Sequence, residues 1–210
     1  MPDTKISAFS DAGALTGAEI VPLAGGGANE RTTTQAIADL GGGGGMTLLQ
    51  TLTGSGGPTL DFTTLGSTKT WRMLGRFIIP ASDETVGLRF GTGGGPTYAA
   101  TNYDYESYQV NSAGTPAAVF GSGQTYILLG GAESSAGRGV SFDLTIMQNP
   151  ANTFVSVVGS ATYFGSDGLF YSIRIGGGWT AVAALTAMRI FNAGGANITS
   201  GVASLYGVSE

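Results

Sequence analysis

The chain has 210 residues, enough for one domain with its own core, or for one domain and a short arm. Glycine accounts for 37 of them, more than twice the share of about 7% in average proteins, and charged residues make up only 11% against about 25%. Because disordered chains are poor in apolar residues and rich in charge, the hydrophobic fraction of 42% indicates a folded protein.

Several kinds of chemistry are excluded by absent residue types. Without cysteine or histidine, the chain alone cannot form disulfides, Cys/His zinc sites, Ser-His-Asp triads or thiol nucleophiles. The net charge of −5 opposes binding to a phosphate backbone or an anionic bilayer, so we expect neither nucleic acid nor a membrane as a partner. No Gly-Lys-Ser/Thr follows the glycine-rich segments, and we expect no cofactor. Since the N-terminus lacks the pattern of a signal peptide, synthesis in the cytoplasm is expected.

Residues 1–40 are predicted to form a short extended arm. They contain one strand candidate, Glu19–Leu23, and one short helix candidate, Thr34–Leu40. Five glycines follow at positions 41–45 and predict a flexible linker, because glycine loses the most backbone entropy on ordering. Forty residues are too few to bury a core of their own, so we expect the arm to become ordered against another surface.

Residues 46–210 carry the period-two pattern of half-buried strands. Apolar and polar residues alternate at Val86–Phe90 and at Val140–Ile146. Seven further strands are predicted, at Trp71–Ile79, Tyr98–Val110, Tyr126–Leu129, Phe154–Val158, Leu169–Ile175, Met188–Phe191 and Ile198–Tyr206. Breaks between strands are predicted at Gly93–Pro96, Gly121–Gly123, Asn149–Pro150 and Gly176–Gly178. This spacing indicates an all-β fold, an antiparallel sandwich or barrel.

The N-terminal segment resembles the opening segment of many tailed-bacteriophage virion proteins. The resemblance is carried, in order, by Lys5–Ala8, Leu15–Leu23, Gly25–Gly27 and Arg31–Thr34, which leads into Ile37. This segment opens tail fibres, tailspikes and head fibres, and the resemblance implies attachment to another virion protein. Five apolar residues are the candidate contacts for that attachment: Ile20, Val21, Leu23, Ile37 and Leu40.

The rest of the chain is similar to a jelly-roll-like domain of phage tail and structural proteins. The similarity is carried by Leu88–Phe90 with Asn102–Glu106, and by the ending from Met188–Phe191 through Asn197–Gly201 to Leu205–Val208. It implies a sandwich of the jelly-roll type. Because fibres and decorations of these families usually assemble as threefold objects, it also implies a homotrimer.

Three polar residues alternate with tyrosines in one predicted strand. Asn102, Asp104 and Glu106 would project from one face at intervals of about 6.7 Å. Carboxylates at such a spacing could serve a glycosidase or bind a hard cation such as calcium. The alternative is a solvated strand face opposite a tyrosine-lined one, which we favour because a single strand supplies no further ligand.

Aromatic residues are the other candidates for ligand contact. Trp179 follows three glycines in a predicted loop, where an exposed indole, with Tyr163 and Tyr171 nearby, could stack on a sugar ring. Alternatively, Trp179 packs on the sandwich core or on a neighbouring subunit. Trp71 begins an apolar strand and is predicted to lie in the core.

Together these features predict a non-enzymatic virion structural protein. Residues 1–40 would be the attachment arm, residues 41–45 the linker, and residues 46–210 the sandwich displayed on the particle as a short fibre or a capsid decoration. One alternative is a receptor-binding tail fibre tip that recognises a host glycan. A second is a small depolymerase that uses Asp104 and Glu106.

Overall fold

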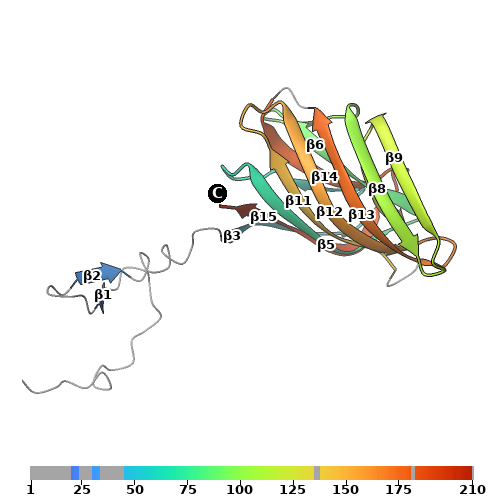
Figure 1. Cartoon of the computed structure of the whole chain (residues 1–210), viewed down its shortest axis with the longest axis horizontal. Coiled ribbons are helices and arrows are strands. Elements are labelled where there is room, and N and C mark those ends of the chain that lie inside the picture. The colour runs from blue at the N-terminus through green and yellow to red at the C-terminus, as the bar shows by residue number, and fades with distance from the viewer. Residues whose placement is uncertain (1–19, 24–29, 34–44, 135–137, 181–182, 210) are drawn as a thin grey trace, which may run out of the picture. The chain divides into compact units, whose positions relative to one another are not determined.

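The computed structural model describes residues 20–23, 30–33, 45–134, 138–180 and 183–209. These residues form strands and loops, and no helix occurs among them (Figure 1). The chain divides into two compact units, Met1–Gly45 and Met46–Glu210. The division falls at the end of the five-glycine run.

The first unit contains one antiparallel strand pair. Strand β1 (Ile20–Leu23) pairs with β2 (Glu30–Thr33), so that Ile20 lies opposite Thr33. The strand predicted at Glu19–Leu23 is therefore confirmed as β1. The helix predicted at Thr34–Leu40 lies outside the residues that the structure describes.

The second unit consists of strands only, and every pair of neighbouring strands is antiparallel. The strands are β3 (Met46–Thr53), β4 (Thr59–Phe62), β5 (Thr70–Pro80), β6 (Glu84–Thr92), β7 (Thr97–Tyr98), β8 (Tyr103–Asn111), β9 (Pro116–Gln124), β10 (Ile127–Ala132), β11 (Val140–Gln148), β12 (Phe154–Phe164), β13 (Phe170–Thr180), β14 (Leu185–Asn192) and β15 (Ile198–Val208). The prediction of an all-β antiparallel fold is confirmed.

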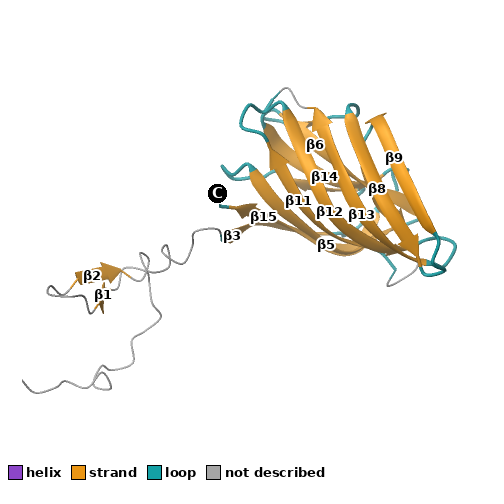
Figure 2. Ribbon diagram, in the orientation of Figure 1, coloured by secondary structure: helices purple, strands orange, loops and turns teal. Residues whose placement is uncertain are grey.

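These strands are divided between two sheets (Figure 2). The larger sheet has eight strands in the order β3-β15-β5-β11-β12-β13-β8-β9. The smaller sheet has the order β10-β6-β14-β4, with β7 paired to β6. Buried side chains from both sheets form one hydrophobic cluster, as in a sandwich whose inner faces pack together.

Alternation along the strands produces this core. In β11, Val140, Phe142, Leu144 and Ile146 are buried, and the residues between them are only half-buried. Trp71 is 2% exposed, which confirms its predicted place in the core. Its indole nitrogen donates a hydrogen bond to the Leu65 carbonyl at 2.7 Å, so the polar end of this large side chain is satisfied inside the protein.

Two of the predicted breaks are wrong, because their glycines lie inside strands. Gly121–Gly123 belongs to β9 and Gly176–Gly178 belongs to β13. Packing explains part of this: a Cβ on Gly178 would lie 2.5 Å from the ring of Phe154 on the neighbouring strand. The predicted strand Tyr98–Val110 is interrupted before Tyr103, where Asn102 takes a left-handed φ of 67° that ends regular pairing.

Strands β3, β4 and β9 were not predicted from the sequence. Strand β3 forms one edge of the larger sheet and β9 forms the other. Most residues of β9 are exposed, and β3 is exposed over its first three positions. Edge strands of this kind lack a buried apolar face, so the alternating pattern that reveals a strand is weak in them.

Shortening Leu144 tests the core. Leu144 is fully buried, so Leu144→Ala should lower the free energy of unfolding by about 2–5 kcal/mol through lost burial and the cavity left behind. Met147→Ala on the same strand is the control, because Met147 is 38% exposed and its change should stay within about 0.5 kcal/mol. Urea unfolding followed by circular dichroism measures both, and equal effects would contradict this core.

Candidate functional site

A cleft of about 360 Å³ opens between the two sheets. Tyr163 of β12 and Tyr171 of β13 line it from the larger sheet, and Gly131 and Ala132 of β10 line it from the smaller one. The two tyrosines are opposite each other in the strand register, and their rings stack with centroids 4.8 Å apart. The structure thus brings together two of the three aromatic residues predicted to contact a ligand.

Three carboxylates line the cleft beside these rings, and each already accepts hydrogen bonds from neighbouring residues. Tyr171 donates a hydrogen bond from its hydroxyl to Asp167 at 2.6 Å. Asp83 accepts hydrogen bonds from the backbone amide and the hydroxyl of Ser134, at 2.7 and 2.8 Å. Glu84 accepts hydrogen bonds from the amides of Gly194 and Ala196. These side chains order the rim of the cleft.

The same contacts fix the charges in the cleft. The hydrogen bonds from Ser134 lower the pKa of Asp83, and the hydrogen bond from the Tyr171 hydroxyl lowers the pKa of Asp167. Burial raises the pKa of Tyr163 to about 12. At neutral pH both aspartates are ionised and the ring of Tyr163 is neutral, so the cleft offers hydrogen-bond acceptors beside a stacked aromatic pair.

The expectation of an exposed Trp179 in a loop is wrong. Strand β13 continues through its glycines to Thr180, and Trp179 is 7% exposed. Its ring lies 6.0 Å from the rings of Phe90 and Tyr103, measured between centroids. Of the two interpretations, packing on the sandwich core is therefore the one that the structure supports, and Trp179 is not available to a ligand.

Tyr103 joins this aromatic cluster to the smaller sheet. Its side chain is fully buried, and its hydroxyl accepts a hydrogen bond from the Phe90 amide at 2.8 Å and donates one to the Ala99 carbonyl at 3.3 Å. Burial raises the pKa of Tyr103 to about 12. The buried amide of Phe90 thus depends on this hydroxyl for a partner.

The polar face predicted on β8 is present. Asp104 and Glu106 are exposed, whereas Tyr103, the first residue of β8, is buried in the core. Hydrogen bonds from Ser122 and Gly123 lower the pKa of Asp104, so Asp104 is ionised at neutral pH. Asn102 precedes the strand.

In the described structure, no third carboxylate joins Asp104 and Glu106 to form a metal site. Over the described part of the chain, no group of three or more Asp, Glu, His or Cys residues is placed to hold a metal ion. Asp104 and Glu106 occupy alternate positions of β8. Asn102, the third residue of the predicted site, precedes this strand. Both carboxylates lie on the exposed face of β8.

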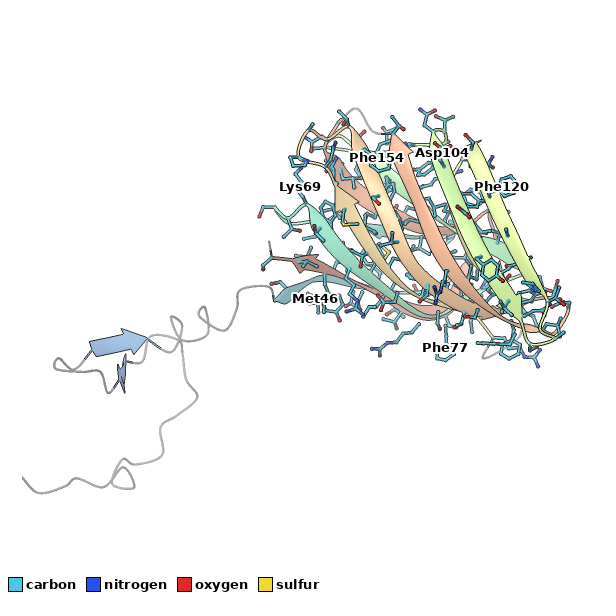
Figure 3. The ribbon with its side chains drawn as sticks, in the orientation of Figure 1. Met46, Lys69, Phe77, Asp104, Phe120 and Phe154 are labelled. Carbon is cyan, nitrogen blue, oxygen red and sulfur yellow. The ribbon has the colours of Figure 1, made fainter. Side chains whose placement is uncertain are left out.

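Sequence reasoning missed a shallow groove of about 440 Å³ on the outer face of the larger sheet. Figure 3 labels Phe154, Asp104 and Phe120 near one end of this sheet, on strands β12, β8 and β9. The groove is lined by Asp104, Tyr105, Glu106, Gly121, Ser122, Phe154 and Gly176–Gly178. The signal available in the sequence is that Gly176–Gly178 directly continues an alternating segment.

The predicted attachment residues belong to the first unit. Ile20, Val21 and Leu23 lie in β1. Ile37 and Leu40 lie outside the described residues.

Comparison of the chain with protein-family models, with curated proteins and with solved structures finds no match. In the described residues, no helix has the length and apolar character needed to cross a membrane.

Removing the buried hydroxyl of Tyr103 should destabilise the protein. Tyr103→Phe leaves the Phe90 amide without a partner in the core, at a cost of about 1–3 kcal/mol in the free energy of unfolding. Tyr108→Phe is the matched control, since Tyr108 lies on the outer side of the same strand and is 52% exposed. Urea unfolding of the two variants should separate them, and equal stabilities would show that the hydroxyl of Tyr103 has no structural role.

Alkaline pH should unfold the protein over a defined range. Tyr103 and Tyr163 keep their protons up to about pH 12 when folded, whereas an unfolded tyrosine loses its proton near pH 10. The unfolded chain therefore binds fewer protons between these values, and stability should fall as the pH rises from 10 to 12. Each ring contributes roughly 2–3 kcal/mol to the loss.

Urea unfolding at a series of pH values measures this loss. Tyr103→Phe should show a smaller decline than the unmodified chain over the same range, because one of the two titrating rings is gone. A stability that stays level from pH 10 to 12 would be inconsistent with the burial of these rings.

Proposed function

We propose that the chain is a non-enzymatic structural protein of a bacteriophage virion. Residues 1–40 would bind another virion protein, and residues 46–210 would stand on the particle surface as a short fibre or a capsid decoration. The observation that carries this proposal is the division of the chain at Gly45: the second unit closes its core between its own two sheets. A self-contained body joined through glycines to a small segment suits display from an anchor.

We infer further that the sandwich is of the jelly-roll type, and the strand order supports this. A jelly roll places eight consecutive strands in two sheets of four, with orders 1-8-3-6 and 2-7-4-5. Counting β3, β4, β5, β6, β10, β11, β14 and β15 as strands one to eight gives β3-β15-β5-β11 and β4-β14-β6-β10. The hairpins β8–β9 and β12–β13 then extend the first of these sheets.

A homotrimer is part of the proposal, and the outer face of the larger sheet supports association of copies. Every large hydrophobic residue that is exposed in the described structure lies in a strand of the larger sheet. They are Met46, Leu48, Phe77, Tyr108, Val110, Phe120, Met147, Phe154, Val158, Phe170 and Val202. Apolar surface gathered on one side of a protein is typical of an interaction face. We assign the contact between copies to the part formed by β3, β5 and β15, with Met46, Leu48, Phe77 and Val202. Light scattering should give three times the monomer mass.

The second candidate function is recognition of a host glycan. It no longer involves Trp179, which is buried, and the specific observation in its favour is the half-buried ring of Tyr171, which stacks on the buried Tyr163 in a cleft with ionised aspartates. Aromatic rings and acceptor groups are the usual means of holding sugars. Loss of glycan binding in Tyr171→Ala would support a site in this cleft.

Immunogold electron microscopy tests the main proposal. An antibody that recognises residues 46–210 should label intact particles, over the capsid for a decoration or at the tail for a fibre. Particles grown with a chain that lacks residues 1–40 should lose the label, because the anchor is missing. Unlabelled intact particles would contradict a virion role, and a label that persists after the deletion would contradict the anchor.

A further inference from the structure

Gly176 is a glycine that neither the backbone nor the packing of this chain requires. It lies inside β13, its φ is not in the left-handed region, and a Cβ added there would approach nothing closer than the Glu106 carbonyl oxygen at 3.9 Å. Its neighbours differ: a Cβ on Gly177 would lie 3.0 Å from the Cβ of Tyr105, and one on Gly178 would lie 2.5 Å from the Phe154 ring. Contacts within the chain explain those two glycines but not Gly176.

Glycine inside a strand weakens it, and it usually marks a bulge or a place where a ligand or another backbone approaches closely. Strand β13 has no bulge at Gly176. Strand β13 pairs with β12 on one side and with β8 on the other, and both registers run without a shift past this residue. Close approach by a group from outside the chain is the remaining explanation.

The space above Gly176 belongs to a continuous groove. The hollow of about 440 Å³ next to Phe154 and a second hollow of about 240 Å³ next to Tyr108 and Arg174 share Gly176 and Glu106. A Phe154 ring that is 45% exposed stands on the β12 side, and Tyr108, 52% exposed, stands on the β8 side. The larger hollow alone falls within the range of about 300–1,000 Å³ that is usual for ligand sites.

The groove also contains a free carboxylate and a free guanidinium. Among the described residues, neither Glu106 nor Arg174 has an ion pair or a side-chain hydrogen bond. Elsewhere on the same face, Arg72 is paired with Asp143. Unlike Arg72, these two groups keep their hydrogen-bonding capacity for a partner from outside.

We propose that this groove binds a neutral oligosaccharide, with one sugar ring lying over Gly176. A pyranose has an apolar face of C–H groups that suits Phe154 and Tyr108, and a rim of hydroxyls. The hydroxyls would donate to the Glu106 carboxylate and accept from the Arg174 guanidinium. Asp104 adds a further negative charge to the groove, which disfavours acidic sugars. Glycine at position 176 lets the ring approach the backbone.

This inference rests on the second candidate function, glycan recognition, and moves its site from the tyrosine cleft to the outer groove. Gly176→Leu is the direct test, because a Cβ at this position meets nothing closer than 3.9 Å and the rest of the side chain would occupy the groove. Ser172→Leu is the matched control, since Ser172 is exposed on the same face of the same strand, four residues away. The full chain and both variants are applied to an array of neutral oligosaccharides with sialylated and uronic-acid glycans beside them.

We expect the unmodified chain to bind neutral glycans and Gly176→Leu to lose that binding, with Ser172→Leu and the cleft variant Tyr171→Ala unchanged. Glu106→Gln and Arg174→Gln, both at exposed positions, should each weaken binding about tenfold or more, which keeps the test valid if Gly176→Leu folds poorly. Thermal unfolding of each variant provides the folding control.

Three results would overturn the proposal. Binding lost in Tyr171→Ala but kept in Gly176→Leu would place glycan recognition in the cleft. An array on which the unmodified chain binds nothing would remove glycan recognition altogether, while leaving the virion role to the microscopy. A change of oligomeric mass in Gly176→Leu without any glycan binding would assign the groove to a second copy of the chain.

Discussion

Burial of two apolar sheet faces against each other is the constraint on which the rest of this protein depends. The chain has no cysteine for disulfides and few charges, so the free energy of folding comes from burying apolar surface between the sheets. Leu88 of the smaller sheet and Leu144 of the larger are both fully buried in one cluster. All the described residues of this cluster lie within residues 46–210.

The alternating segments were the predictable part of the fold. Val86–Phe90 and Val140–Ile146 place an apolar residue at every second position, and both lie in strands that contribute to the core. Edge strands such as β9 escaped prediction, because neither of their faces is strongly apolar. Sheet order depends on contacts between residues far apart in the chain, and local periodicity does not report them.

The candidate site was predictable only in part. Tyr163 and Tyr171 do meet, since they occupy paired positions on neighbouring strands. The sequence does not predict the place of Trp179, because Gly176–Gly178 is typical of a turn, whereas these glycines pair with strands on both sides. Which glycines are required by neighbouring side chains, and which leave open space, depends on tertiary packing that a single sequence does not contain.

Independence of the sandwich from the first unit is the central claim, and denaturant unfolding of residues 46–210 expressed alone tests it most directly. The fragment and the full chain should unfold at the same urea concentration with nearly the same slope, because the slope follows the surface that becomes exposed and the shared core supplies most of it. A fragment that is unfolded in water, or that unfolds at a clearly lower urea concentration, would show that the first unit completes the core.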